Sequence, residues 1–517
     1  MPVLILLLLI ALPVAAARPG SVMDCFMDGD DPSVRLAACN KTIADLDVTD
    51  ALRARAFLSR AEVRRTSLNF EGALADLDAA IELGGGDTAA RLSRALFLNG
   101  LGRPEEALDE LDLVLGTDPS SSKAYTLRGD IFFRLGETDL GMRDLAEALR
   151  LNPDDPGPFR VRGRTFLRAG DATAAVGELE QAYALEPDDR ITLSLLGTAR
   201  LRAGQPAAAI KAFDKLIAHA PDKAPDNMEA RMTRAAAHGQ VKNFAAAIGD
   251  YTVVLETRPD DMEAREARGV ARLFNDEPAG AETDFTAILV QHPGNQRVSL
   301  FRGSARFAQQ KYADAEADFD DVLDAFPNDA DTRLNRGLAR LALGRPDDAI
   351  EDFTVALNED PDLELAQRRR AQAYVLTGAF ADAVGAFDAL FQKRRAVPRA
   401  ADAVWRFIAA KRSGSTDATE TLKRMTQGND PTVWPGALVD GLEGQVTVDA
   451  VVKEAARDPE EAAARLTETR FVLGQLALAD GQIALARENF TAAVDSGSVD
   501  LIEYQGAVLE LQRLNNN

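Results

Sequence analysis

The chain is poor in the residues that most often bind metals. Its 517 residues include only two cysteines and three histidines. A structural zinc site needs about four Cys or His ligands in close spacing. His219, His238 and His292 lie far apart in the sequence, and Cys25 and Cys39 lie elsewhere. We therefore expect no metal site and no cofactor.

The motifs that position catalytic groups are also missing. The sequence has no H-E-x-x-H, no G-x-S-x-G and no glycine loop that would cradle a phosphate. Gly84-Gly85-Gly86 falls at a turn between two of the repeats described below. Catalysis needs a nucleophile with a base, a carboxylate pair in a cleft, or a metal. We expect a protein that is not an enzyme.

A surplus of positive charge is absent as well. There are 59 basic and 82 acidic side chains, which gives a formal charge of −23. A nucleic-acid groove depends on neutralising phosphates, so no nucleic-acid partner is expected. The hydrophobic fraction of 46% is that of a globular chain and argues against disorder.

Only one segment of the chain is long and continuously apolar. Val3 to Val14 precede Ala15-Ala16-Ala17, the pattern of a secretory signal peptide. The run is shorter than the roughly 20 residues of a membrane span. We predict a signal peptide over 1–17 and a soluble, exported mature chain without a membrane span, located in the periplasm of a Gram-negative bacterium. An uncleaved anchor is the alternative. The cleavage point has no cysteine beside it, so the sequence does not indicate a lipid anchor.

Export would allow the two cysteines to form a disulfide. An oxidising compartment permits disulfides, and Cys25 and Cys39 are 14 positions apart with no third cysteine. A redox pair is the alternative, but C-x-x-C spacing is absent. We predict a structural disulfide in an N-terminal cap over 18–53, worth about 3 kcal/mol for a loop of this size.

The central part of the chain repeats every 34 residues. An Arg-Gly pair is followed 12 residues after the glycine by alanine, four further on by a large apolar residue, and eight after that by proline. The pattern is clearest at Arg162-Gly163, Arg268-Gly269, Arg302-Gly303 and Arg336-Gly337. The register predicts ten repeats over 54–397, with a four-residue insertion at 224–227. They begin at Ala54, Thr88, Ser122, Pro156, Arg190, Met228, Met262, Gln296, Ala330 and Glu364.

This pattern resembles the tetratricopeptide repeat family. Small residues at positions 8 and 20 let two helices approach closely, an apolar residue at position 24 fills the space between them, and proline at position 32 ends the second helix. One unit cannot bury its own apolar face, so neighbours must stack. The resemblance implies an all-α, right-handed superhelix, here with helical caps at both ends. It also implies protein partners that bind as peptide or helix segments.

Position 7 of the repeat is arginine in nine of ten units, and position 23 is acidic in eight of those nine. A guanidinium can bond a carboxylate through two parallel hydrogen bonds. We predict an Arg–carboxylate pair inside each such repeat, partly buried between its helices. Examples are Arg302 with Asp318 and Arg336 with Asp352. A row of ligand-binding arginines is the alternative.

The family resemblance implies that positions 2, 5, 9 and 12–13 of the first helix line the concave groove. In the fourth repeat these positions include three arginines along one helical face. We predict a basic stripe that holds an acidic peptide or a terminal carboxylate. Its alternative role is pairing with neighbouring acids or keeping the groove soluble. The stripe comprises Lys123, Arg134, Arg160, Arg164, Arg168 and Arg202.

The register stops after Pro398, and residues 398–517 form a predicted C-terminal helical region. A further repeat-like unit begins near Thr467, and a capping helix follows over about 501–514. The region resembles that of NlpI-type periplasmic adaptors at Trp405, Trp434, 466–474, Phe490, Ala493-Val494, Glu503 and Glu510-Leu511. Ordinary core packing is the alternative explanation of these residues.

The resemblance implies a non-enzymatic adaptor that brings peptidoglycan hydrolases to a processing protease in the cell envelope. A structural scaffold of an envelope assembly or polysaccharide-export complex is the alternative. The C-terminal region is also a candidate surface for homodimer formation.

Overall fold

The computed structural model describes residues 22–26, 32–84, 88–219, 225–393, 399–428, 430 and 432–516. The predicted signal peptide over 1–17 lies outside these residues. Within them the chain forms 28 α-helices, one 3-10 helix and no strand, which confirms the prediction of an all-α solenoid fold. The described residues form two compact units, one within residues 1–241 and one within residues 242–517. We call them the N-terminal unit and the C-terminal unit.

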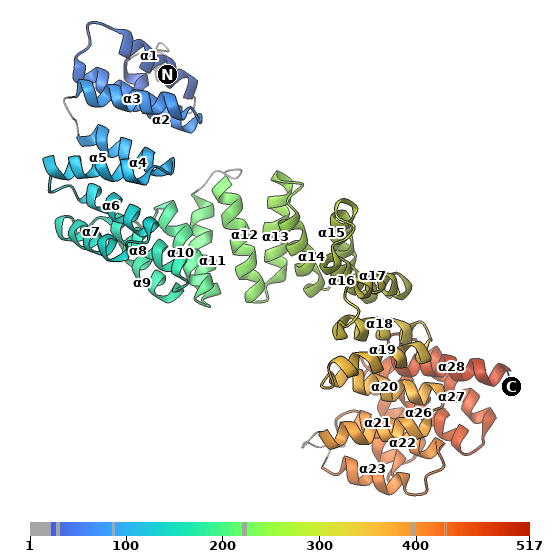
Figure 1. Ribbon diagram of the computed structural model, residues 1–517. Coiled ribbons are helices and arrows are strands. Elements are labelled where there is room, and N and C mark those ends of the chain that lie inside the picture. The colour runs from blue at the N-terminus through green and yellow to red at the C-terminus, as the bar shows by residue number, and fades with distance from the viewer. Residues whose placement is uncertain are drawn as a thin grey trace, which may run out of the picture. The chain divides into compact units, whose positions relative to one another are not determined.

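The N-terminal unit begins with a short cap and continues as helices joined in pairs by tight turns (Figure 1). Its elements are η1 (Val22–Cys25), α1 (Pro32–Ala44), α2 (Asp50–Thr66), α3 (Phe70–Leu83), α4 (Thr88–Gly100), α5 (Pro104–Thr117), α6 (Ser122–Leu135), α7 (Thr138–Leu151), α8 (Pro156–Ala169), α9 (Ala172–Leu185), α10 (Arg190–Arg202), α11 (Pro206–Ala218) and α12 (Pro225–Gln240).

The C-terminal unit continues the paired arrangement and then departs from it. Its elements are α13 (Phe244–Thr257), α14 (Met262–Phe274), α15 (Pro278–Gln291), α16 (Gln296–Ala308), α17 (Tyr312–Ala325), α18 (Ala330–Ala342), α19 (Pro346–Glu359), α20 (Glu364–Thr377), α21 (Phe380–Lys393), α22 (Ala400–Arg412), α23 (Ala418–Thr426), α24 (Gly436–Leu442), α25 (Val448–Ala455), α26 (Ala462–Ala479), α27 (Ile483–Asp495) and α28 (Ile502–Asn516).

Local sequence signals set the helix ends, as the α14–α15 pair illustrates. The side chain of Asp261 accepts a hydrogen bond from the amide of Ala264 and so caps the N-terminus of α14. The turn that follows places Asp276 at a φ of 58°, in the left-handed region that Asn and Asp tolerate better than most residues. Pro278 then occupies the first turn of α15, where its missing N–H costs nothing.

A close helix-to-helix approach holds each pair together. In α14, a Cβ added to Gly269 would lie 2.6 Å from Cε1 of Phe285, so only glycine fits beneath this ring. Phe285 is fully buried. The C-terminal repeat-like unit uses the same arrangement at Gly474 and Phe490. This contact explains why a small residue at position 8 is matched by a large one at position 24 in the repeats.

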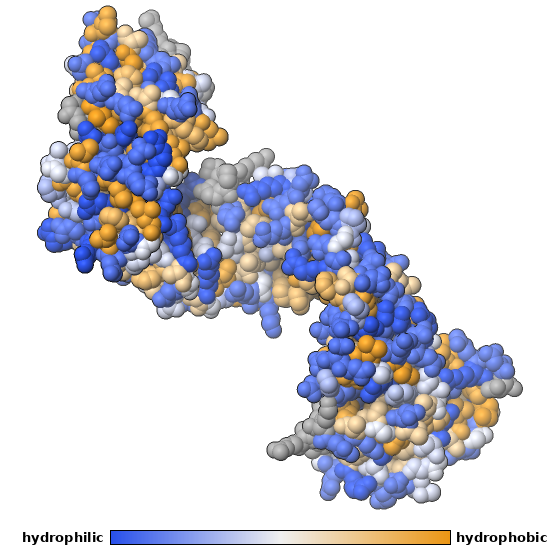
Figure 2. All heavy atoms as spheres, viewed as in Figure 1, coloured by the Kyte–Doolittle hydropathy of each residue, from blue (hydrophilic) through white to orange (hydrophobic). Residues whose placement is uncertain are grey.

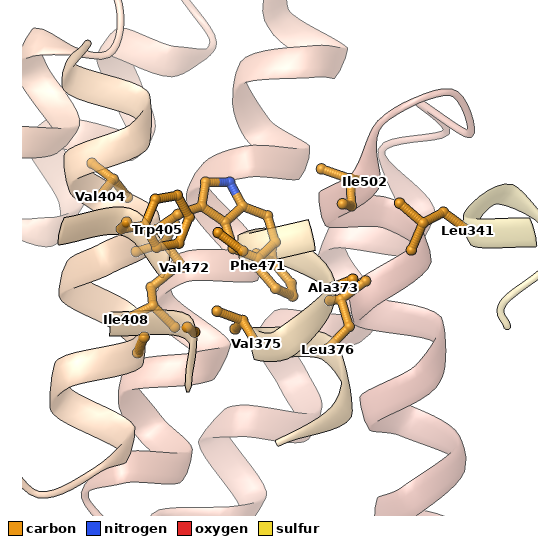
Figure 3. Close-up of a cluster of buried hydrophobic side chains, with 14 of the residues drawn as sticks. Leu341, Ala373, Val375, Leu376, Val404, Trp405, Ile408, Phe471, Val472 and Ile502 are labelled. Atoms are coloured by element: carbon orange, nitrogen blue, oxygen red, sulfur yellow. The ribbon is translucent and has the colours of Figure 1, made fainter. Parts of the chain in front are cut away.

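The last helix of the C-terminal unit turns back onto earlier ones. α28 contacts α18 as well as α26 and α27. Its Ile502 joins a core cluster around Trp405 and Phe471, whose ring centroids are 5.2 Å apart, together with Leu376 of α20 (Figure 3). Among the described helices, none is long and apolar enough to cross a membrane.

Candidate functional site

A pocket of about 380 Å³ lies across the first helices of three consecutive repeats in the N-terminal unit. We call it the α4–α6–α8 pocket. Its apolar lining comes from Leu92 and Leu96 of α4, Leu127 of α6 and Val161 of α8. Figure 2 shows apolar and charged residues interspersed on the visible face of these helices. The pocket therefore combines an apolar lining with charged surroundings.

Helical spacing explains why α4 supplies two residues to this pocket. Leu92 and Leu96 stand at positions 5 and 9 of the second repeat, four residues apart and on one face of the helix. The side chain of Leu96 is 61% exposed. An exposed apolar residue in a concave setting, rimmed by charges, is the usual mark of an interaction site.

The charged residues in and beside the pocket are largely engaged in ion pairs, within the fourth repeat and between the fourth and third repeats. Arg160 donates to Asp189 at 2.7 Å, and Arg164 pairs with Asp130. Burial acts to raise the pKa of Asp189, but hydrogen bonds from Thr192 and Arg160 outweigh it, so the pKa lies below its usual value. Asp189 is thus ionised at neutral pH and balances Arg160.

Of the other four members of the predicted basic stripe, two bond to the preceding repeat and two are exposed. Arg134 donates to the side chain of Asn99 at 2.7 Å, and Arg202 donates to the carbonyl of Leu167 at 3.4 Å. Both bonds reach the preceding repeat. Lys123 and Arg168 are exposed, and Lys123 lines the pocket.

Of the six residues of the stripe, which was expected as a set of ligand-binding cations, three bond to the preceding repeat, one bonds within its own repeat and two are exposed. Asp130 of the third repeat comes within bonding distance of Arg164 once the two repeats stack. The sequence-based prediction did not include the leucines of the pocket. Their signal was present, because Leu92 and Leu96 stand at positions 5 and 9 of the second repeat, which the family resemblance places in the groove.

The Arg–carboxylate positions come together inside the repeats. Nη2 of Arg302 lies 2.6 Å from Oδ1 of Asp318, and Nη2 of Arg336 lies 2.6 Å from Oδ1 of Asp352. Both aspartates are almost fully buried. In the tenth repeat, where Ala386 replaces the acid, Arg370 donates to Thr354 instead, at 3.4 Å.

A second arginine, at position 11, joins four of these pairs. Arg306 lies 2.9 Å from Asp318 and Arg340 lies 2.8 Å from Asp352. Two cations thus share one buried carboxylate, which accepts hydrogen bonds on both oxygens. The same arrangement occurs at Asp76 with Arg60 and Arg64, and at Asp284 with Arg268 and Arg272.

The arginines also connect one repeat to the next. Arg336 reaches Asp320 of the preceding repeat at 2.6 Å, and Arg306 reaches Glu282 at 3.0 Å. Burial acts to raise the pKa of Glu282, but hydrogen bonds from Lys311, Arg306 and Gln309 lower it to about 2. The network is therefore continuous across repeat boundaries, whereas the sequence indicated only pairs within repeats.

The N-terminal cap carries the disulfide position. The structure joins Cys25 of η1 to Cys39 of α1, with Cα atoms 4.7 Å apart. The carbonyl of Cys25 accepts hydrogen bonds from Ser59 and Arg35, which ties the cap to α2. Among the residues that the structure describes, no three His, Cys, Asp or Glu side chains are grouped so as to hold a metal ion.

Comparison with known proteins identifies the class. Two sequence models of the tetratricopeptide repeat match residues 58–122, 160–227, 194–261 and 300–364, and residues 122–155. Together they span just over half of the chain. The protein belongs to the tetratricopeptide repeat family, and a protein-binding scaffold fits this membership.

Several solved structures are similar to parts of the chain. A tetratricopeptide repeat protein from Parabacteroides merdae is 19% identical, with 48% of this chain and 97% of that chain covered and a TM-score of 0.35. For pilF of Pseudomonas aeruginosa the values are 18%, 42%, 97% and 0.36. For YrrB, described as having an unusual peptide-binding site, they are 20%, 37%, 97% and 0.30. Similarity at this level carries no argument about partners.

Proposed function

We propose that this protein is a non-enzymatic scaffold or adaptor that binds a peptide or helix segment of another exported protein in the α4–α6–α8 pocket. The observation that carries the proposal is the exposure of Leu96 at a groove position of the second repeat. A leucine left in water costs about 1–2 kcal/mol of burial energy that a partner can recover. That energy corresponds to roughly a tenfold change in affinity.

The chemistry of the pocket defines the segment it would hold. The lining offers an apolar contact from Leu92, Leu96 and Val161, with the exposed ammonium of Lys123 beside them. Since Arg160 and Arg164 are balanced by acids, a ligand bound by charge alone is disfavoured. An apolar anchor residue with a nearby acidic group fits best.

The cellular setting is part of the proposal. The apolar run over 3–14 argues for export, and a disulfide between Cys25 and Cys39 is typical of oxidising compartments. The C-terminal residues that resemble NlpI-type adaptors, among them Trp405 and Trp434, favour envelope partners. We infer a periplasmic adaptor for peptidoglycan hydrolases or a processing protease.

Crosslinking with mass spectrometry in the native envelope tests this function. Leu96→Asp should remove the crosslinked partner, because a carboxylate cannot enter an apolar contact without desolvation. Leu113→Asp is the matched control, since Leu113 is 52% exposed on the second helix of the same repeat and does not line the pocket.

Peptidases among the partners would support the adaptor, and subunits of a secretion or polysaccharide-export complex would favour the structural scaffold instead. Partner capture that survives Leu96→Asp would contradict the assignment of the pocket.

A further inference from the structure

The C-terminal unit contains a helix that is bound by the chain's own repeats. α28 lies against the first helices of the last repeats and against α26. We call the area beneath it the α28-binding surface. It is formed by Leu341, Arg369, Leu376, Trp405, Arg412, Phe471 and Gln475. Several of these residues surround Ile502 in Figure 3.

The buried face of α28 is unusual in its chemistry. Besides Ile502, its buried residues are Glu503, Gly506, Ala507 and Glu510. Most amphipathic helices bury an apolar stripe, but this one buries two carboxylates seven residues apart, with two small residues between them. The two glutamates therefore lie two turns apart on one face.

Each buried carboxylate has specific partners on the α28-binding surface. The indole N–H of Trp405 donates to Oε1 of Glu503 at 2.9 Å. The amide of Gln475 donates to Oε1 of Glu510 at 3.1 Å, and Nη1 of Arg412 lies 3.6 Å from the same oxygen. The partners are fixed side chains from α22 and α26, so they define two recognition points.

Charge complementarity adds to these contacts. Burial lowers the pKa of Arg369 and of Arg412, while Glu503 and Glu510 respectively act to raise them. Nε of Arg369 is buried and has no hydrogen-bond partner among the described residues. Burial also raises the pKa of Glu503, so the attraction between the arginines of the surface and the glutamates of α28 offsets part of the desolvation cost of both.

Steric fit provides a third recognition element. A Cβ added to Gly506 would lie 2.5 Å from Cε2 of Phe471 and 2.8 Å from Cδ2 of Leu376. A helix with a larger residue here could not approach as closely. The pattern required at the surface is therefore Glu-x-x-Gly-Ala-x-x-Glu.

Energetics favour a recognition role over a purely structural one. Buried ion pairs recover little net free energy, because desolvation offsets the attraction, and their best-attested effect is to fix register. α28 is the last helix described, and it follows the exposed Gly497 in a short linker. Its release would uncover Phe471 and Leu376, while the helix pairs α18–α19, α20–α21 and α26–α27 keep contacts of their own.

We propose that the α28-binding surface is a second helix-binding site of this protein, and that its external ligand is an amphipathic helix of the pattern Glu-x-x-Gly-Ala-x-x-Glu that displaces α28. This site is separate from the α4–α6–α8 pocket and uses a different mode of recognition, a helix laid in a preformed groove. Tethering gives α28 a millimolar effective concentration, so the intact chain is a closed form.

A cleavable full-length chain tests this inference. A protease site is inserted between Gly497 and Ser498, and a fluorescent peptide of residues 499–516 is titrated by anisotropy. The cut chain should exchange its severed helix for the peptide, and the uncut chain should bind about 100-fold more weakly because of the tether. Leu96→Asp in the cut chain should leave peptide binding unchanged, which separates this site from the proposed pocket.

Peptide variants test the recognition pattern. Glu503→Gln and Glu510→Gln should each weaken binding about tenfold, because a charge-assisted bond is lost. Gly506→Leu should abolish binding, whereas Gln512→Ala, at an exposed position, should bind normally. In the uncut chain, Gly506→Leu should open the surface to the wild-type peptide. Equal binding by cut and uncut chains, equal binding of all peptides, or failure of the severed helix to exchange would each overturn the proposal.

Discussion

The first helices of the second to fourth repeats and those of the last repeats share one sequence register but differ in what covers them. In the N-terminal unit, position 9 of the second repeat is Leu96, which is 61% exposed. In the C-terminal unit, position 9 of the tenth repeat is Gln372, which is 5% exposed, and position 13 is Leu376, which is 2% exposed. The same repeat position is thus a solvent-facing surface in one unit and a buried core position in the other.

This difference teaches that the role of a repeat position depends on the segment that returns to it. α28 reaches back across the last repeats, and Gln310 at the end of the eighth repeat's first helix donates to Asp500 at 2.9 Å. In the N-terminal unit, the α4–α6–α8 pocket has no such helix among the described residues. The family fold is common to both units, and the covering helix distinguishes their surfaces.

Truncation of Trp405 should give the largest difference in local stability between the two units. Trp405→Ala removes a buried ring from the α28-binding surface and leaves Glu503 without its indole donor. A Trp→Ala cavity costs about 3–5 kcal/mol and an orphaned buried acceptor adds to it, so we expect about 5 kcal/mol of lost local stability in α26–α28. Leu96→Ala should cost well under about 1 kcal/mol.

Hydrogen exchange followed by mass spectrometry measures both effects in the same molecules. Comparable losses of protection around residues 405 and 96 would contradict the contrast between a covered and an open surface.

Removal of a shared carboxylate from the Arg–carboxylate networks should give the second-largest difference in stability between the two units. Asp318→Ala leaves Arg302 and Arg306 without their shared carboxylate, and removal of one partner from a buried pair costs about 3–5 kcal/mol. Asp144→Ala in the N-terminal unit affects Arg128, which keeps Asp112 at 2.7 Å. We expect about half the loss there, measured as exchange of amides in α6–α7 and α16–α17.

A double-mutant cycle completes this experiment. Replacing Arg302 and Asp318 together should cost less than the sum of the two single changes. Zero coupling energy would show that the bond contributes nothing to folding.

A pH dependence confined to the C-terminal unit is the smallest predicted effect. Burial and the nearby carboxyl of Glu503 raise the pKa of Glu468 to about 7, and Trp434 donates to Glu468 at 2.5 Å. The folded state then holds a proton that the unfolded state has released. The contribution to unfolding free energy is therefore present below pH 4.5 and falls by up to about 3 kcal/mol as the pH rises through 7.

Urea unfolding followed by tryptophan fluorescence isolates this effect, because Trp405 and Trp434 are the only tryptophans of the chain and both lie in the C-terminal unit. Glu468→Gln should remove most of the difference between pH 5 and pH 8. Glu420→Gln, at a well-exposed side chain, should leave it unchanged, and an equal effect of both variants would contradict the assignment.

The repeated part of the fold could be predicted because its information is local. A small residue at position 8, glycine or alanine, and a large residue at position 24 recur with the 34-residue period, and the helices begin where the register places them, as at Met262 and Gln296. Arginine at position 11 recurs as well, but the predicted ion pairs involve only positions 7 and 23. The double use of Asp318 was therefore missed although its signal was present.

The covering helix could not be predicted in the same way. The contact of the segment leading into α28 with earlier repeats joins residues 190 positions apart, as between Gln310 and Asp500, and no periodicity marks such a contact. The sequence singles out Glu503 and Glu510 only through the family resemblance and indicates no partner for either. Only the folded chain shows that Trp405 and Gln475 lie beside them.

The links between successive repeats also give each array a mechanical property. Asp78, Asp112 and Asp320, which pair with arginines of the following repeat, have side chains that are 48% to 66% exposed. Ions of the medium screen such exposed charges over about 8 Å at physiological ionic strength, while the buried aspartates inside each repeat are shielded from them. The links between repeats through these exposed acids are therefore salt-sensitive, and the part of an array's bending stiffness that they supply falls as the ionic strength of its surroundings rises.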